Sequence, residues 1–315
     1  MLTFILRRIV ALIPLLFIVS VIVFGLVLLV PGDAATRLAG GEDASPQKIE
    51  EVRKELGLDR PFVTQYVDWL KGAVKLDLGD SLYSQRPVAS EIWERVPVTL
   101  QIAGGALVFG LLIGIPLGLI SGMRPRGIGD RGVVMVTSFA IAIPSFWLAL
   151  ILILQFAVYR NILPSRGFVK FSESPTDWFE HLLLPWITLG TLTAATIARQ
   201  LRGALADTMS SDHIRTSRSV GLPSTKVVGK HALKNSSAPV LTVVGLQVAY
   251  LLGGTVVVES IFGIAGLGTY VLTAVQQNDL PAIQGSVLFI AVLTVLVNLV
   301  VDISYAILNP KVRVE

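Results

Sequence analysis

The chain has 315 residues, of which 53% are apolar and only 15% are charged, and its mean hydropathy is +0.70. These values exclude an ordinary soluble domain and indicate a membrane protein with several spanning helices. The net charge of +4 does not point to nucleic acid, because the basic residues are distributed by loop rather than gathered with aromatic residues. The chain has no cysteine, which excludes disulfides, thiolate metal sites and thiol catalysis.

Six apolar runs are long enough to cross a bilayer as helices. The first follows Arg7 and Arg8, is too long for a cleavable signal peptide and ends without a small-residue cleavage site. The sequence therefore predicts an all-α polytopic membrane protein with six transmembrane helices. Their predicted ranges are Ile9–Val30, Val98–Gly122, Val133–Val158, Leu182–Ala198, Pro239–Val258 and Ser286–Ile307.

The short loops predict the orientation of these spans. One of them carries Arg124, Arg126 and Arg131, whereas the loop from Ile261 to Gly285, on the opposite side, has neither lysine nor arginine. Short loops rich in Lys and Arg stay in the cytoplasm. We therefore expect both termini to face the cytoplasm.

The predicted organisation has three parts. Residues 1–30 form a tail and the first helix, residues 31–97 form an extracytoplasmic cap, and residues 98–315 form a five-helix core that includes a cytoplasmic loop, 199–238. Within the cap, the pattern predicts a helix that begins near Ser45 and ends at Gly57, followed by a second amphipathic helix. Phe62, Tyr66 and Trp69 recur at helical spacing in this second helix, which favours an aromatic packing cluster over a ligand site.

The cytoplasmic segment from Arg199 to Pro239 is polar and basic in an otherwise apolar chain. In its middle, Gly221 suits the left-handed residue that ends a helix, and Pro223 suits the first turn of the next one. The segment therefore predicts a helix, a tight turn and a second helix. We interpret it as a docking surface for a soluble partner; the alternative is a basic anchor that only fixes topology.

Catalytic and metal-binding patterns are missing from the sequence. There is no phosphate-binding glycine loop that ends in Lys and Ser or Thr. The histidines, His181, His213 and His231, have no metal-ligand spacing. The glycine-rich stretch Gly263–Gly268 departs from the dinucleotide pattern and favours a tight re-entrant turn. We therefore expect no catalytic residue, no metal site and no cofactor bound by this chain.

Polar groups inside the spans are candidates for a transport path. Gln247 and Glu259 belong to the fifth span, where Gly253 and Gly254 allow a kink or a close helix contact. Asn298 and Asp302 share one face of the sixth span. For these two, hydrogen bonding between helices, with Asp302 near Arg7 or Arg8, is the favoured alternative to a path.

Several strings together resemble one transport family. Asp212-His213-Ile214-Arg215-Thr216-Ser217-Arg218, then Gly221-Leu222 and His231-Ala232-Leu233, is similar to the EAA loop of ABC importer permeases in its dipeptide and oligopeptide version. Ser217 stands where that version has Ala. The resemblance continues through Val30-Pro31-Gly32-Asp33, Leu56-Gly57-Leu58-Asp59-Arg60-Pro61, Ile143-Pro144-Ser145-Phe146-Trp147 and Val258-Glu259-Ser260-Ile261-Phe262, with Ala34 and Ala265 in place of usual prolines.

The resemblance implies a type I importer permease in a bacterial or archaeal cytoplasmic membrane. Such a permease pairs with a second, homologous permease, two cytoplasmic ATPase subunits that bind ATP and magnesium, and an extracytoplasmic peptide-binding protein. A short helix, here about Thr208–Val220, would dock on the ATPase. The implied coupling residues are Asp212, Ile214, Arg215, Thr216, Ser217, Arg218, Gly221, Leu222 and His231, and the candidate path residues are Gln247, Gly253, Gly254, Glu259 and Asn298.

Other functions stay open at this stage. Relatives of the family are associated with nickel, glutathione and haem as well as with peptides. An ion-coupled secondary transporter would show internal repeats and a buried carboxylate near the middle of the membrane, and we find no repeat. A structural scaffold in a membrane complex would need the docking loop but no path.

Overall fold

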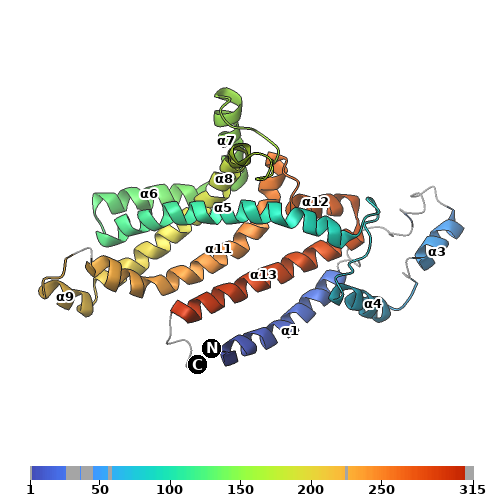
Figure 1. Cartoon of the computed structure of the whole chain (residues 1–315), viewed down its shortest axis with the longest axis horizontal. Coiled ribbons are helices and arrows are strands. Elements are labelled where there is room, and N and C mark those ends of the chain that lie inside the picture. The colour runs from blue at the N-terminus through green and yellow to red at the C-terminus, as the bar shows by residue number, and fades with distance from the viewer. Residues whose placement is uncertain (1, 26–35, 37–44, 56–58, 224–225, 309–315) are drawn as a thin grey trace. The chain divides into compact units, whose positions relative to one another are not determined.

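The structure is a computed structural model that describes residues 2–25, 36, 45–55, 59–223 and 226–308. Most of these residues are helical, and an isolated β-bridge pairs Asp80 with Pro87. In chain order the helices are α1 (Leu2–Gly25), α3 (Pro46–Glu55), α4 (Phe62–Val74), α5 (Val88–Met123), α6 (Ile128–Ala142), α7 (Ser145–Leu152), η3 (Ile153–Tyr159), α8 (Pro175–Met209), α9 (Asp212–Ser219), η4 (Val227–Ala232), α11 (Leu233–Phe262), α12 (Leu267–Gln277) and α13 (Leu280–Leu308), with η marking π-helix (Figure 1).

Among the described residues, four helices are long and apolar enough to cross a membrane: α5, α8, α11 and α13. A fifth span results if α6 is taken together with α7 and η3. The described apolar part of α1, Val10–Gly25, is shorter, and residues 26–30 of the predicted first span lie outside the described residues. The count of six spans therefore stays a prediction.

The predicted span Val133–Val158 is interrupted by a sharp bend. The chain bends by 98° between α6 and α7. Ile143 has an extended backbone (φ −78°, ψ 122°) and is followed by Pro144. Proline disfavours the helical conformation of the residue before it and cannot donate a backbone hydrogen bond. Hydropathy alone does not detect this break, because the helices on both sides of it are apolar.

Several helices extend beyond the predicted apolar cores. The helix α5 begins at Val88 rather than Val98, and α8 runs from Pro175 to Met209 rather than from Leu182 to Ala198. At the start of α8, the Ser174 hydroxyl accepts a hydrogen bond from the Asp177 amide at 3.3 Å, and Pro175 occupies the first helical turn. These caps allow polar turns to continue the helix past its apolar part.

The chain divides into two compact units. Unit 1 contains residues 98–265 and 296–315 together with the first five residues, and unit 2 contains residues 6–97 and 266–295. In unit 1, α5 and α8 approach closely along a row of glycines, one per turn: Gly110, Gly114, Gly118 and Gly122. A Cβ atom at Gly114 would lie 2.7 Å from the Ala194 carbonyl oxygen, so a larger residue would force the helices apart.

Apolar side chains complete the core of unit 1 between α5, α8 and α11. Its buried members are Ile197, Leu201 and Val240, and Leu111, Ile115, Leu119, Leu233 and Val244 pack against them. Because α8 contributes residues from successive turns to this core, its long axis is fixed against both neighbours. The end of α8 that leads into α9 is thereby positioned by the rest of unit 1.

In unit 2, an aromatic cluster joins α1 to α4. The ring of Phe24 lies 5.1 Å from Phe62, 5.5 Å from Tyr66 and 5.4 Å from Trp69, measured between ring centroids. The Ser20 hydroxyl also contacts the Tyr66 hydroxyl at 2.8 Å. These contacts match the expected packing cluster: the three aromatic residues of α4 hold this helix against α1.

Candidate functional site

The turn after α9 adopts the predicted left-handed conformation. Gly221 has φ +81°, its amide donates to the Arg218 carbonyl at 3.0 Å, and the Leu222 amide donates to the Ser217 carbonyl at 3.2 Å. This pair of hydrogen bonds is the Schellman arrangement, which satisfies the last carbonyls of a helix. The helix ends at Ser219, one residue before the predicted end at Val220. It begins at Asp212 rather than at the predicted Thr208, because Thr208 belongs to the last turn of α8. Pro223 begins the next turn, because its carbonyl accepts from the Lys226 and Val227 amides.

One apolar side chain anchors α9 to the rest of unit 1. Ile214 is fully buried and packs in a cluster with Leu205 of α8 and with Val227 and Ala232 of η4. Polar contacts add to this anchor: His213 Nδ1 lies 2.9 Å from the Ser211 hydroxyl, and Asn235 donates to His213 Nε2 at 3.3 Å. The helix is therefore fixed along one face to α8 and to the start of α11.

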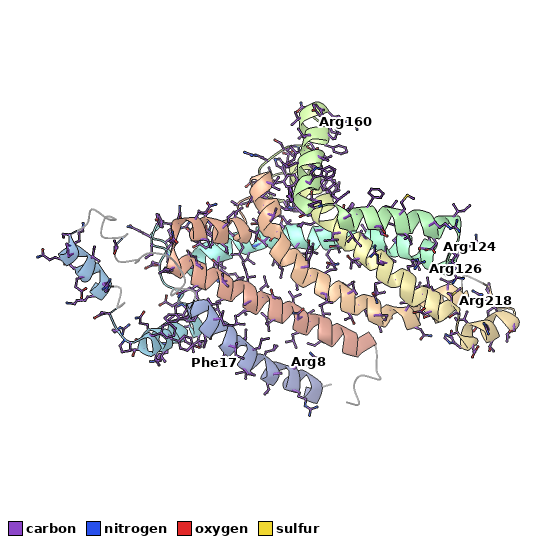
Figure 2. All side chains as sticks on the ribbon, turned by 180° about the vertical axis from the view of Figure 1, so that it is seen from behind. Arg8, Phe17, Arg124, Arg126, Arg160 and Arg218 are labelled. Carbon is purple, nitrogen blue, oxygen red and sulfur yellow. The ribbon has the colours of Figure 1, made fainter. Side chains whose placement is uncertain are left out.

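The opposite face of α9 and the turn after it are open to solvent. Arg215 and Arg218 are exposed, Val220 is 76% exposed, and Leu222 is 37% exposed. Figure 2 shows Arg218 at the same end of unit 1 as Arg124 and Arg126, and Arg160 far from that end. The result is a basic surface with two exposed apolar side chains.

The predicted coupling residues thus divide into two sets. Ile214 is the anchor, and Ser217 is half-buried; its hydroxyl donates to the His213 carbonyl at 2.8 Å. His231 lies in η4, and its side chain is outside the described part of the structure. The remaining predicted residues are exposed: Asp212, Arg215, Thr216, Arg218, Gly221 and Leu222.

The candidate path residues do not form one exposed surface. Glu259 is fully buried and accepts a hydrogen bond from the Thr99 hydroxyl at 2.7 Å, and Gln247 is 8% exposed. Gly254 packs against Leu189, whereas Gly253 and Asn298 are exposed. The Glu259 carboxylate therefore links α11 to α5 inside unit 1, and its role in a path stays a prediction that requires it to become exposed.

One face of α11 is exposed along its length, and the sequence did not predict it. Exposed residues recur at spacings of three and four along it, which is one side of a helix. The stripe consists of Thr242, Leu246, Tyr250, Gly253, Val257 and Ser260. Gly253 belongs to this stripe and Glu259 does not. The spacing of these residues can be read from the sequence. The other faces of α11 are also apolar, however, so the sequence does not show which face packs against the rest of unit 1.

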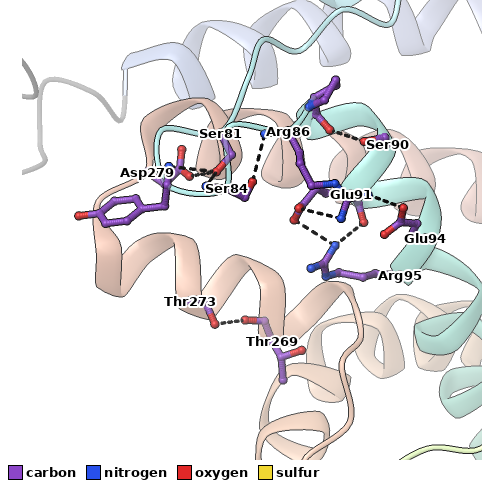
Figure 3. A network of polar contacts seen from close by, with 12 residues as sticks. Ser81, Ser84, Arg86, Ser90, Glu91, Glu94, Arg95, Thr269, Thr273 and Asp279 are labelled. Carbon is purple, nitrogen blue, oxygen red and sulfur yellow. Dashed lines mark hydrogen bonds and ion pairs between the residues drawn. The ribbon is translucent and has the colours of Figure 1, made fainter. Parts of the chain in front are cut away.

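Unit 2 contains a buried polar network around Asp279 (Figure 3). The Asp279 carboxylate accepts from the Ser81 hydroxyl at 2.5 Å, from the Leu82 amide at 3.2 Å and from the Ala282 amide at 3.3 Å. The last of these bonds satisfies an amide in the first turn of α13. We call these four residues the Asp279 network.

Beside this network, Glu91 is buried and paired with two arginines. Arg95 lies 3.1 Å and Arg86 lies 3.4 Å from its carboxylate (Figure 3). The Arg95 guanidinium also lies 4.5 Å from the centre of the Tyr270 ring. Burial, with the nearby charges of Glu91 and Asp279, raises the pKa of Tyr270 to about 12, so the phenol stays protonated at neutral pH.

The long apolar helices, together with an α9 that is anchored on one face and exposed on the other, define a polytopic membrane protein of the permease class. Residues 114–314 match the family described as binding-protein-dependent transport system inner membrane component, and residues 1–103 match the N-terminal family of the same systems. The chain belongs to this inner membrane component family.

Curated relatives cover the whole chain. A putative peptide transport system permease protein of Brucella abortus (strain 2308) is 39% identical over 311 residues, which are 99% of each chain. The glutathione transport system permease protein GsiC of Escherichia coli (strain K12) is 40% identical over 313 residues, again 99% of each chain. These relatives are permease subunits and not enzymes themselves.

A solved structure confirms the fold. A chain of the inward-facing MetNI methionine ABC transporter matches with a TM-score of 0.54 and 19% identity, covering 70% of this chain and 96% of that one. This likeness shows the type I ABC permease fold. As a multi-pass inner membrane component of a binding-protein-dependent system, the chain is a permease subunit of an ABC importer, and this class implies partner ATPases and a solute-binding protein.

Proposed function

We propose that the chain forms one half of the membrane channel of an importer for dipeptides or oligopeptides, and that α9 docks on a cytoplasmic ATPase. The observation that carries this proposal is the structure of α9. Its Ile214 is buried, and on its other face Arg215 and Arg218 are exposed next to the turn at Gly221 that ends the helix. A docking element needs both properties: a rigid attachment to the channel and a free face.

The attachment of α9 supports a mechanism for coupling. Movement of a docked ATPase would displace α9, and Ile214 would transmit the displacement to α8 and to η4 as a rigid-body motion. The Ser236 hydroxyl of α11 also contacts Thr208 at 3.1 Å and donates to the Ala204 carbonyl at 3.1 Å. Because α8 and α11 would move together, the channel would open alternately to the two sides of the membrane.

The proposed complex contains a second, homologous permease, two ATPase subunits that bind ATP and magnesium, and an extracytoplasmic binding protein. The charge of the short loops supports placing both termini in the cytoplasm, with α12 on the outer side, because the loop that contains α12 lacks lysine and arginine. A half-channel needs a partner, and the exposed stripe on α11 is available to line a shared path.

Glutathione is the second candidate substrate. Relatives named for peptide transport and for glutathione transport are 39% and 40% identical to this chain. These identities are too similar to favour one substrate over the other. Both kinds of solute carry amide bonds and charged termini. The binding protein would then decide which of them is delivered to the channel.

Mass spectrometry of proteins that copurify with the chain from mild-detergent membranes tests the docking proposal. The native chain should bring down a second permease and ATPase subunits. Gly221→Arg should lose the ATPases and abolish uptake while still inserting, because a bulky residue at φ +81° strains the turn and changes the docking surface.

Gly221→Asn is the matched control, since asparagine tolerates the left-handed conformation better than other residues with side chains. It should retain the ATPases. A native chain that purifies alone or as a homodimer would contradict the importer proposal. Retention of coupled uptake by Gly221→Arg would contradict the docking site.

A further inference from the structure

Unit 1 contains an ion pair between the buried carboxylate of Asp130 and the half-buried side chain of Arg202. Asp130, in the first turn of α6, is only 3% exposed. Arg202 of α8 donates to both of its carboxylate oxygens, from Nε at 2.5 Å and from Nη2 at 2.8 Å. The Ser121 hydroxyl of α5 and the Arg126 amide, at 2.7 Å, also donate to it. One carboxylate therefore joins the end of α5, the start of α6 and α8.

The geometry of this pair is more restrictive than that of an apolar contact. A guanidinium that binds a carboxylate through two parallel hydrogen bonds fixes both the distance and the orientation of the two groups. The Arg126 amide, which also donates to this carboxylate, belongs to a turn with an uncommon backbone conformation, because Arg126 has φ +66°. A buried carboxylate with several donors resists any motion that separates them, because each lost bond leaves a desolvated group without a partner.

The ion pair lies next to the anchor of α9. Leu205 follows Arg202 by about one turn of α8, and it is fully buried in the cluster that contains Ile214 of α9. A Cβ atom at Gly122 of α5 would lie 2.9 Å from the Cβ atom of Leu205. The last turns of α8 are thus held by α9 on one side and by the α5–α6 turn on the other.

We propose that Asp130 and Arg202 are positioning residues that make the α5–α6 turn move as one body with α9. The inference rests on the proposed docking of α9 on an ATPase. With the ion pair intact, displacement of α9 carries α8 and the start of α6 together, so that the broken span α6–α7 takes part in the opening of the channel. Without it, α8 shifts against α6 and part of the displacement is lost.

The test compares transport with ATP hydrolysis in the assembled complex. The native chain and the variants Asp130→Asn, Arg202→Lys and Ser121→Ala are reconstituted in proteoliposomes with their copurifying ATPases, the binding protein and a peptide mixture. The readout is the number of peptides imported per ATP hydrolysed, normalised to assembled complex. We expect this ratio to fall by about 2- to 30-fold in Asp130→Asn and Arg202→Lys, with less effect in Ser121→Ala.

Asp68→Asn is the matched control, since it removes a carboxylate from an exposed ion pair with Arg60, at 3.0 Å, and should leave the ratio unchanged. A fall in the amount of assembled complex with an unchanged ratio would overturn the proposal, because the ion pair would then only stabilise the fold. An unchanged ratio with full assembly would overturn it as well. Absence of ATPases from the native complex would instead refute the proposed function. The proposed role of Asp130 and Arg202 would then fall as well, because it depends on the docking of α9.

Discussion

The α9 segment of unit 1 and the Asp279 network of unit 2 are both polar structures at helix ends, but they use their polar groups in opposite ways. In α9 the apolar Ile214 is buried and the charged residues are exposed. In the Asp279 network the carboxylate is 1% exposed and its donors surround it. The first arrangement leaves charged side chains free to bind a partner, whereas in the second the carboxylate is hydrogen-bonded within the chain.

The difference indicates which polar residues can contact other molecules. Arg215 of α9 lies 3.7 Å from Asp212, and both side chains are largely exposed, so this ion pair can open at little cost. Asp279 cannot leave its donors without a large desolvation penalty. We therefore expect substitutions in α9 to change association with partners, and substitutions in the Asp279 network to change stability.

The largest effect is expected for Ile214→Ser. It leaves a cavity and buries a hydroxyl in an apolar cluster, which costs about 3–5 kcal/mol in the attachment of α9. The ATPases should be lost from the purified complex, while membrane insertion is retained. Ile214→Val, which removes one methylene, should keep them at a cost of about 1 kcal/mol. Equal ATPase recovery from both variants would show that Ile214 is not the anchor.

A smaller effect is expected for Asp279→Ala. It removes the acceptor for Ser81, Leu82 and the first turn of α13, which should lower the free energy of unfolding by about 2–3 kcal/mol. Thermal unfolding of the purified complex measures this loss. Asp279→Asn retains an acceptor oxygen and should lose less. Uptake per assembled complex should stay at the native value, and a selective loss of uptake would mean that the network also has a functional role.

The smallest effect is expected for Tyr270→Phe. The Tyr270 hydroxyl is buried and has no hydrogen-bond partner among the described residues. Its removal should therefore leave stability unchanged or raise it by up to about 1 kcal/mol at neutral pH. Thermal unfolding measured beside Asp279→Ala provides the comparison. A clear destabilisation would show that this hydroxyl makes a hydrogen bond in the assembled complex.

Alkaline pH gives a second test at Tyr270. The pKa is raised to about 12 from an ordinary value of 10, so the folded state holds the phenolic proton more tightly than the unfolded state does. Because the unfolded chain releases this proton first, the free energy of unfolding does not depend on this ionisation below about pH 10 and falls as the pH rises from about 10 to 12. Tyr270→Phe should show a weaker decline over this range than the native chain.

The sequence by itself determined the class of protein and the local structure of α9. Apolar runs identify membrane helices because the bilayer core demands them, and the runs that became α5, α8, α11 and α13 were all predicted. Gly221 predicted the end of α9 because few other residues adopt φ +81°. The break at Ile143–Pro144 could have been predicted from the same kind of local rule, since proline restricts the residue before it.

Only the tertiary structure decided which polar groups are buried. Glu259 lies near the end of a predicted span, yet it is fully buried and accepts a hydrogen bond from Thr99 of α5. Asp130 and Arg202 are far apart in the sequence, where nothing links a carboxylate in the α5–α6 turn to one particular arginine of α8. Their pairing depends on the close approach of α5 and α8 along the glycine row, which is a property of packing rather than of local sequence.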